Sequence, residues 1–295
     1  MMGELNHQIA LPEGTISFRF AGHSDRGAVR RLNEDSFLAS MPLFLVADGM
    51  GGHAFGDRAS QAAVAAFSSA FDDGAASPRV VLETIRRANE AVLSVSENSD
   101  TPDAISGTTL AGVAFVTIGP GEGYHWMAFN IGDSRIYSWN GRTLSQLSVD
   151  HSAVQELVDL GQITRSEAER HPDRNIVTRA LGADLEVDAD IWLVPARARQ
   201  TFIVCSDGLP KELSDDEIAR IIVFHHSQAQ RGSDGMPITL AERLVNAAIA
   251  AGGSDNVTVV VVESDMVGSG AGPTTEETID RDAMPAFLEE TRPRG

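Results

Sequence analysis

Residues 43–60 read LFLVADGMGGHAFGDRAS, and this stretch joins the two kinds of element from which the fold is built. The apolar run at residues 43–47 predicts a β-strand, and the pattern of residues 57–71 predicts an amphipathic helix. Asp48 stands where the predicted strand ends, and a glycine-rich segment follows it. The stretch therefore predicts a strand, an acidic turn and a helix in succession.

Outward from this stretch, short apolar runs alternate with helical patterns. Further strands are predicted at residues 16–20, 37–38, 108–118, 124–131, 191–194, 202–205 and 257–263. Helices are predicted in two pairs, at residues 57–71 and 78–97 and at residues 214–225 and 240–251. Because strands occur in neighbouring groups and helices occur in pairs, we expect an α+β layered sandwich rather than an alternating parallel sheet.

Four aspartates stand at the ends of predicted strands. Asp48 follows LFLVA, Asp133 follows MAFNIG, Asp207 follows TFIVCS, and Asp255 precedes NVTVVVV. Any one of them would ordinarily be a turn residue. Four carboxylates that converge, however, would repel one another unless a cation lay between them. Carboxylates without His or Cys partners favour Mg²⁺, Mn²⁺ or Ca²⁺ over zinc, so the pattern indicates a site for hard metal ions.

Two neighbouring segments add groups to this candidate site. Gly49 follows Asp48 directly, and a glycine allows a backbone carbonyl to approach an ion closely. Upstream, SDRGAVRRLNEDSF (residues 24–37) contains Glu34 and Asp35, which offer further oxygen ligands. Arg30 in the same segment is suited to a bidentate contact with phosphate, although an arginine pair in a loop is also typical of an ordinary solvated surface.

The bulk composition narrows the classes of function. The chain has 295 residues, of which 42% are hydrophobic, and a formal net charge of −19, which argues against a nucleic-acid partner. A phosphate-bearing substrate would also be repelled unless local cations attracted it. The sequence shows no secretory signal, no apolar run that would span a bilayer, and one cysteine, Cys205. We therefore expect a cytoplasmic protein without a disulfide framework or a Cys-based zinc site.

The chain divides into a main body and two further segments. Residues 150–188 are polar and helical, which predicts a small subdomain inserted into a main domain of residues 1–265. Residues 266–295 are rich in Gly, Thr and Glu and predict a flexible tail.

Seven segments, in order along the chain, carry a family resemblance. They are SDRGAVRRLNEDSF (24–37), VADGMGGHAFGDRAS (46–60), SGTTLAGV (106–113), NIGDSRIY (130–137), NIVTRALG (175–182), SDGL (206–209) and SDNVTVVVV (254–262). This series resembles the PPM or PP2C-type metal-dependent protein serine/threonine phosphatases, specifically their bacterial branch. An ordered series over residues 16–264 is far more specific than any single motif.

The resemblance implies a four-layer α-β-β-α sandwich (PP2C-like) with a metal cleft at one end and a flap beside it, at about residues 150–188. By the matching motifs, Asp48, Asp207 and Asp255 would hold one Mn²⁺ or Mg²⁺ ion. Asp48 and the Gly49 carbonyl would hold a second ion.

The remaining site residues also follow from the resemblance. Glu34 or Asp35 would contribute to the metal centre directly or through water. Asp133, together with Asp207, would form a weaker third metal site, and Arg30 would bind the substrate phosphate.

The implied activity is hydrolysis of phosphoserine and phosphothreonine on proteins by a water or hydroxide that bridges two divalent ions. The implied partners are a bacterial Ser/Thr kinase and its substrates, and we expect a monomer. Met50 stands where distant eukaryotic relatives have a histidine that is proposed to protonate the leaving group. His53 is the candidate general acid in its place, with a metal-bound water as the rival donor.

Two alternatives remain open from the sequence. GMGGHA matches a dinucleotide-binding template, with Asp72 about twenty residues further on, but Asp48 would repel a pyrophosphate there. A catalytically inactive binding module on the same fold is the other alternative. The intact set of aspartates argues against that module, because it would have no need to retain mutually repelling carboxylates.

Overall fold

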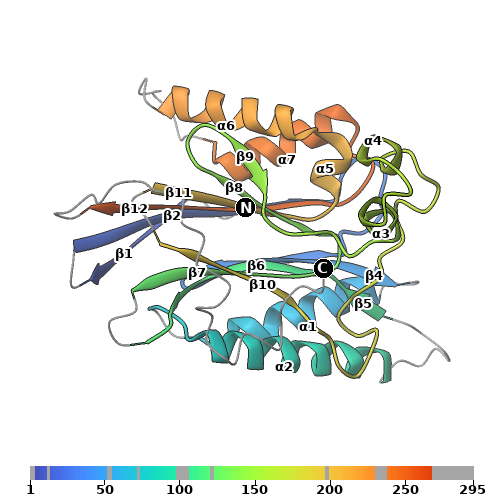
Figure 1. Cartoon of the computed structure of the whole chain (residues 1–295), viewed down its shortest axis with the longest axis horizontal. Coiled ribbons are helices and arrows are strands. Elements are labelled where there is room, and N and C mark those ends of the chain that lie inside the picture. Colours follow the sequence, from blue (N-terminus) through green and yellow to red (C-terminus); the bar gives the residue numbers. More distant parts are fainter. Residues whose placement is uncertain are drawn as a thin grey trace.

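Two β-sheets lie face to face, and helices cover their outer faces (Figure 1). The computed structural model describes residues 4–11, 14–51, 55–71, 74–97, 106–119, 123–196, 199–229 and 238–267. The first sheet contains, in spatial order, β1 (Leu5–Leu11), β2 (Gly14–Asp25), β12 (Val257–Val267), β11 (Arg199–Cys205), β8 (Arg135–Trp139) and β9 (Leu144–Gln146). Neighbouring strands of this sheet are antiparallel.

The second sheet is also antiparallel. Its strands follow the spatial order β10 (Asp190–Pro195), β7 (Tyr124–Ile131), β6 (Leu110–Thr117), β4 (Leu43–Gly51) and β3 (Asp35–Ser40), and the short strand β5 (Ser106–Thr108) pairs with the end of β4.

The helices form the outer layers. On the second sheet lie α1 (Gly56–Ser68) and α2 (Pro78–Glu97), and on the first sheet lie α5 (Gly208–Glu212), α6 (Asp215–Ala229) and α7 (Leu240–Ala251). Two short helices, α3 (Ala153–Asp159) and α4 (Arg165–Ala168), lie at one end of the sandwich (Figure 1). The order of layers is therefore helix, sheet, sheet, helix, as the resemblance implied.

Strand β4 shows how the sequence fixes these layers. Leu43, Leu45 and Ala47 pack on the side of α1 and α2, whereas Phe44 and Val46 pack between the two sheets. Successive side chains of a strand point to opposite faces, so an unbroken apolar run is what a strand covered on both sides requires.

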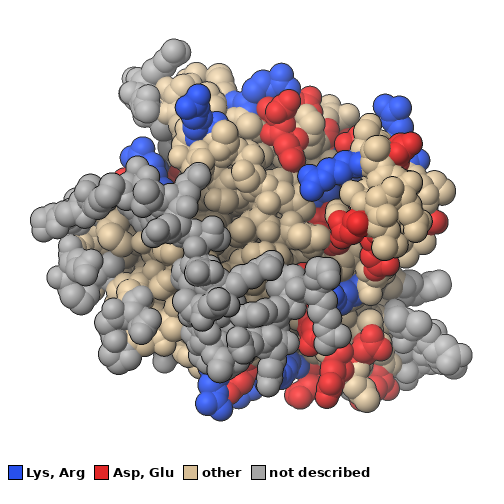
Figure 2. Space-filling view, viewed as in Figure 1, with Lys and Arg blue, Asp and Glu red and all other residues tan. Residues whose placement is uncertain are grey.

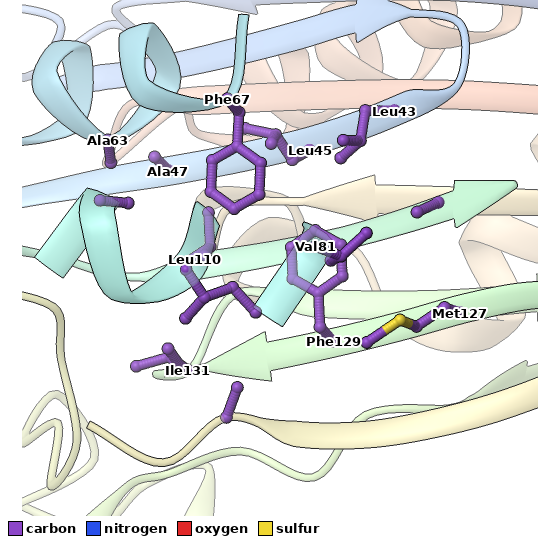
Figure 3. Packing of buried hydrophobic residues seen from close by; sticks show 14 of the residues in the cluster. Leu43, Leu45, Ala47, Ala63, Phe67, Val81, Leu110, Met127, Phe129 and Ile131 are labelled. Carbon is purple, nitrogen blue, oxygen red and sulfur yellow. The ribbon is translucent and has the colours of Figure 1, made fainter. Parts of the chain in front are cut away.

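An aromatic pair lies in the largely aliphatic layer between α1 and the second sheet. Phe67 of α1 stacks on Phe129 of β7, with ring centroids 5.8 Å apart and an interplanar angle of 3° (Figure 3). Both rings are fully buried. Loss of such a ring typically costs about 3–5 kcal/mol, so this layer holds α1 firmly beside the end of β4.

Most predicted elements are confirmed, and the expected bounds 78–97, 124–131 and 240–251 match α2, β7 and α7. The prediction of a single strand at residues 108–118 was wrong, since β5 and β6 are separate strands on either side of Thr109. The sequence analysis missed β1, β8, β9 and α5. These elements have only three to seven residues, which is too short to show a clear period along the sequence.

Three boundaries bear on the site. Strand β4 does not end before Asp48 but continues to Gly51, because residues 49–51 pair with β5. Residues 150–188 contain α3 and α4 and no strand of either sheet. Strand β12 runs to Val267, two residues past the predicted domain end, and residues 268–295 lie outside the described part of the chain.

None of the described helices is long and apolar enough to cross a membrane.

Candidate active site

Aspartates from both sheets meet at one end of the sandwich. In the second sheet, Asp35 begins β3, Asp48 lies within β4 and Asp133 follows β7. In the first sheet, Asp207 follows β11 and Asp255 precedes β12. Asp35 is paired with Asp48 across β3 and β4, and Lys211 contacts both Asp207 and Asp255, so the strand ends bring these side chains together.

Asp35 and Asp48 form the centre of the group. They are opposite each other in the antiparallel pair of β3 and β4. Burial raises the pKa of Asp35 to about 7, and the charges of Asp207 and Asp255 add to the rise. Burial also raises the pKa of Asp48, with further contributions from Asp35, Asp207 and Asp133. Like charges in a buried setting thus disfavour full ionisation of the metal-free site.

Asp133 belongs to the same group. Burial raises its pKa to about 7, and the charges of Asp207 and Asp150 add to the rise. Burial likewise raises the pKa of Asp207.

Ser206 links the two sheets at this point. Its Oγ atom donates a hydrogen bond to Asp35 Oδ2 at 2.8 Å and accepts one from the Thr258 amide at 3.0 Å. Ser206 is fully buried beside Asp207, so it fixes the first sheet against the start of β3. The sequence analysis did not identify it.

Two carboxylate oxygens in the group lack partners. Asp35 Oδ1 and Asp207 Oδ1 are buried and accept no hydrogen bond. Burying a carboxylate oxygen without a partner costs free energy of folding. A divalent cation is the partner that best satisfies such oxygens. The oxygen-only donor set therefore fits Mn²⁺ or Mg²⁺. Among the described residues, no three acidic, His or Cys side chains are already arranged around a single point where an ion would sit.

Lys211 lies between two of these acids. Its Nζ atom is 2.5 Å from Asp207 Oδ2 and 2.8 Å from Asp255 Oδ2. Helix α5 places Lys211 one turn after Asp207. No role for Lys211 was expected from the sequence, although its being the only lysine in the chain is a usable signal.

Arg30 also contacts Asp255. Its Nε atom is 2.7 Å from Asp255 Oδ1, and its Nη2 atom donates to Asp255 Oδ2 at 2.9 Å. Burial works against ionisation of Asp255, but hydrogen bonds from Lys211 and Arg30 outweigh it and lower the pKa of Asp255. The Arg30 side chain is half exposed, so its remaining donors are open to a ligand from solvent.

Asn256 holds the loop that carries Arg30. Its Oδ1 atom accepts a hydrogen bond from the Glu34 amide at 2.9 Å, and its Nδ2 atom donates to the carbonyls of Arg26 at 2.9 Å and Leu32 at 2.8 Å. Asn256 is buried, with 6% of its surface exposed. Its side chain therefore satisfies three backbone groups of one loop, a role that the sequence analysis missed.

Gly49 lies in close contact with its surroundings. A Cβ atom at this position would lie 2.0 Å from the Gly56 carbonyl oxygen and 2.6 Å from the Glu34 carbonyl oxygen. The Gly49 amide donates to that Glu34 oxygen at 3.2 Å. The Glu34 side chain also lies against this segment, because its Oε1 atom is 2.5 Å from the position that a Cβ atom on Gly56 would occupy. Burial raises the pKa of Glu34 as well.

The predicted flap is attached next to Asp133. His151 accepts a hydrogen bond at Nδ1 from the Gly132 amide at 3.0 Å, and its own amide donates to the Gly132 carbonyl at 2.9 Å. His151 Nε2 lies 3.2 Å from Asp190 Oδ2, two residues past the other end of the predicted segment. Both ends of the flap are therefore fixed beside the acidic group.

The charged surface near the flap is mixed. On the face drawn in Figure 2, acidic side chains lie mostly over the half of the molecule that contains α3 and α4, and basic side chains are interspersed among them. A negatively charged ligand would therefore meet both signs of charge at this end.

The structure brings Asp35, Asp48, Asp133 and Asp207 together and links Asp255 to them through Lys211. His53 lies outside the described residues, so its role stays a prediction. The dinucleotide-binding alternative was wrong on the fold. Strand β4 is antiparallel to its neighbours β3, β5 and β6 and does not open a parallel βαβ unit.

Comparisons with known sequences agree with one another. A family model described as Protein phosphatase 2C matches residues 22–245. The serine/threonine protein phosphatase PstP of Mycobacterium tuberculosis is 37% identical over 250 residues, and the match covers 84% of this chain and 45% of PstP. This chain therefore spans about half of the length of PstP. The serine/threonine phosphatase stp of Listeria monocytogenes is 32% identical over 258 residues, which cover 84% of this chain and 96% of stp.

Solved structures are similar as well. The crystal structure of Mycobacterium tuberculosis PstP/Ppp aligns with a TM-score of 0.70 at 37% identity and covers 84% of this chain and 98% of that chain. A structure of the PstP catalytic domain in complex with two manganese ions gives a TM-score of 0.70 at 35% identity, covering 85% of this chain and 99% of that one.

Proposed function

This chain belongs to the protein phosphatase 2C family, and we propose that it is a metal-dependent enzyme that hydrolyses phosphoserine and phosphothreonine in proteins. The observation that carries the proposal is the convergence of Asp35, Asp48, Asp133 and Asp207 from two sheets, with buried oxygens that have no hydrogen-bond partner. Such a group is unstable by itself and suited to divalent ions.

The ligand assignment is part of the proposal. Asp48, Asp207 and Asp255 would hold one ion, and Asp48 and the Gly49 carbonyl would hold a second. Asp133 with Asp207 would hold a weaker third ion. Glu34 or Asp35 would support the centre directly or through water. The donor chemistry and the placement of these residues support the assignment.

The chain's own residues divide the work of phosphate hydrolysis. When bound, Mn²⁺ or Mg²⁺ would lower the pKa of a bridging water and neutralise charge on the phosphoryl group. Arg30 would hold the phosphate oxygens with its guanidinium, from a loop that Asn256 fixes in place. Cys205 is fully buried within β11 and burial raises its pKa, so it is unsuited to act as a nucleophile.

Protonation of the leaving group requires a donor, and His53 is the proposed one. A water held at the metal centre is the alternative. The His53→Ala variant separates them on a phosphopeptide, where the rate should fall and the pH profile should lose a limb. An unchanged rate would refute a role for His53.

The substrates are proposed from the relatives. Both PstP and stp are bacterial serine/threonine phosphatases. We extend this to a bacterial Ser/Thr kinase and the proteins that it phosphorylates as the physiological partners. The cytoplasmic location, the monomeric state, the flap subdomain and the flexible tail stay predictions.

The deciding experiment is a manganese titration of phosphopeptide hydrolysis. The metal-stripped protein should be inactive and should regain activity with Mn²⁺. Asp207→Asn should lose activity by about 100-fold or more, because the site loses a ligand charge. Asp216→Asn is the matched control, because Asp216 is exposed on α6. Activity that persists in EDTA would refute the proposal, and a protein that binds Mn²⁺ but hydrolyses nothing would indicate the inactive binding module.

A further inference from the structure

We propose that the ammonium group of Lys211 occupies a cation position shared by Asp207 and Asp255, and that a divalent ion must displace it to bind there. The inference rests on the ligand assignment proposed above for Asp207 and Asp255. It adds that the chain carries its own competitor for the metal.

Lys211 contacts both acids directly. Its Nζ atom contacts Asp207 Oδ2 at 2.5 Å and Asp255 Oδ2 at 2.8 Å, and its side chain is 30% exposed. The backbone fixes the two acids relative to each other, since a Cβ on Gly208 would lie only 2.0 Å from the Asn256 carbonyl oxygen. Helix α5 and the start of β12 are thus in contact, and the amine bridges the gap between their carboxylates.

The chemistry of a lysine suits this role better than that of an arginine. An ammonium is a compact point charge with three donors, whereas a guanidinium is a planar fork. Of the 23 lysines and arginines of the chain, 22 are arginines, and the single lysine stands between two predicted metal ligands. Because its ammonium group is compact and carries one positive charge, Lys211 resembles a small cation.

Competition follows from simple electrostatics. Both oxygens that contact the amine are ones that an ion would need, and two cations a few ångströms apart repel each other. In the metal-free protein the amine reduces the repulsion between the acids. When a metal binds, that stabilisation is lost, so the measured metal affinity is lower than the acids alone would give.

The first test measures Mn²⁺ affinity by calorimetry, without any substrate. Lys211→Met should bind Mn²⁺ at least about 10-fold more tightly than wild type, because no cation has to leave. Lys211→Arg keeps the charge but not the compact shape, so its Mn²⁺ affinity should lie between those of wild type and Lys211→Met. Arg87→Met, which removes an exposed charge from α2, is the matched control and should not change the affinity.

Stability gives an independent readout. In EDTA, Lys211→Met should melt about 4 °C or more below wild type, because its acids lack a counter-ion. At saturating Mn²⁺ the difference should shrink or reverse, because the variant gains more from the metal. This comparison remains valid even when the metal-free variant is only partly folded, since the metal should restore it.

Chemical labelling of the lone lysine tests displacement directly. Pulse acetylation of wild type, followed by peptide mass spectrometry, should modify Lys211 several times faster with Mn²⁺ than with EDTA, since the displaced amine is no longer held by two carboxylates. Equal labelling rates, together with equal Mn²⁺ affinities of wild type and Lys211→Met, would overturn the inference.

Two outcomes separate this inference from the proposed function. If Asp207→Asn binds Mn²⁺ as wild type does, the ligand assignment itself fails. If Asp207→Asn loses Mn²⁺ but Lys211→Met binds it with unchanged affinity and shows only a raised KM for phosphopeptide, the assignment stands. The inference then fails, because Lys211 would be a substrate contact.

Discussion

Asp35 and Asp48 lie directly opposite each other on the neighbouring antiparallel strands β3 and β4. Two acids in such a position destabilise a sheet unless a proton or a cation lies between them. The stability of the metal-free protein should therefore depend on pH in a direction opposite to that of ordinary acid denaturation.

The direction of this pH dependence follows from the raised pKa values of two aspartates. In the metal-free protein, the pKa values of Asp35 and Asp133 rise from the ordinary 3.8 to about 7. Between about pH 4 and pH 7 the folded protein thus binds more protons than the unfolded chain, and the free energy of unfolding falls as pH rises. Each of the two groups contributes about 2.5 kcal/mol over this range, so we expect urea unfolding in EDTA to show a loss of up to about 5 kcal/mol from pH 5 to pH 7.5.

Asp35→Asn is the control for this pH dependence, because an amide in place of the acid cannot ionise. The variant should lose less stability over the same range. Burial lowers the pKa of His225, which acts in the opposite direction, so the difference between wild type and variant isolates Asp35. Saturating Mn²⁺ should reverse the trend in wild type, since metal binding requires ionised carboxylates. Identical pH profiles of the two metal-free proteins would contradict this account.

Arg30→Lys tests the proposed phosphate contact. A lysine keeps the charge but cannot make the bidentate contact, so KM for a phosphopeptide should rise by about 10-fold or more. Mn²⁺ affinity measured by calorimetry should change by much less. Arg31→Lys, an exposed neighbour in the same loop, should leave KM unchanged. A larger effect of Arg31→Lys than of Arg30→Lys would show that the wrong arginine has been assigned.

Asn256→Asp tests the support of the Arg30 loop. The aspartate cannot donate to the Arg26 and Leu32 carbonyls, and its charge would face both oxygens. We expect a loss of about 2–4 kcal/mol in the free energy of unfolding and a lower rate of hydrolysis. Asn140→Asp is the matched change, because the structure shows the Asn140 side chain accepting hydrogen bonds through Oδ1 alone and the residue is exposed. Asn140→Asp should change the free energy of unfolding very little. Equal losses of stability in the two variants would refute the role of Asn256.

Gly49→Ala tests the close approach at the end of β4. The new methyl group would collide with the carbonyl oxygens of Gly56 and Glu34, so the backbone would have to shift. We expect a loss of about 2 kcal/mol or more and a weaker affinity for Mn²⁺. Gly107→Ala places a methyl group no closer than 3.2 Å to its nearest neighbour and should cost clearly less. Wild-type Mn²⁺ affinity in Gly49→Ala would argue against its carbonyl as a ligand.

The sequence by itself determined the class of fold and most of the acidic set. An unbroken apolar run such as residues 43–47 is typical of a strand covered on both faces, and helical patterns in pairs next to groups of strands are typical of layers that cover a sheet. Asp48, Asp133, Asp207 and Asp255 were visible because each interrupts or borders such a run. These are local properties, and local properties can be read along the chain.

Only the tertiary structure decided which groups meet. Lys211 contacts Asp255, which lies 44 positions further along the chain. Asn256 supports the Arg30 loop from a position more than 220 residues away. Likewise, Asp48 lies inside a strand because β5 extends the pairing of β4. No periodicity encodes such contacts, since they depend on how two sheets are registered against each other and on which charges the packing leaves unpaired.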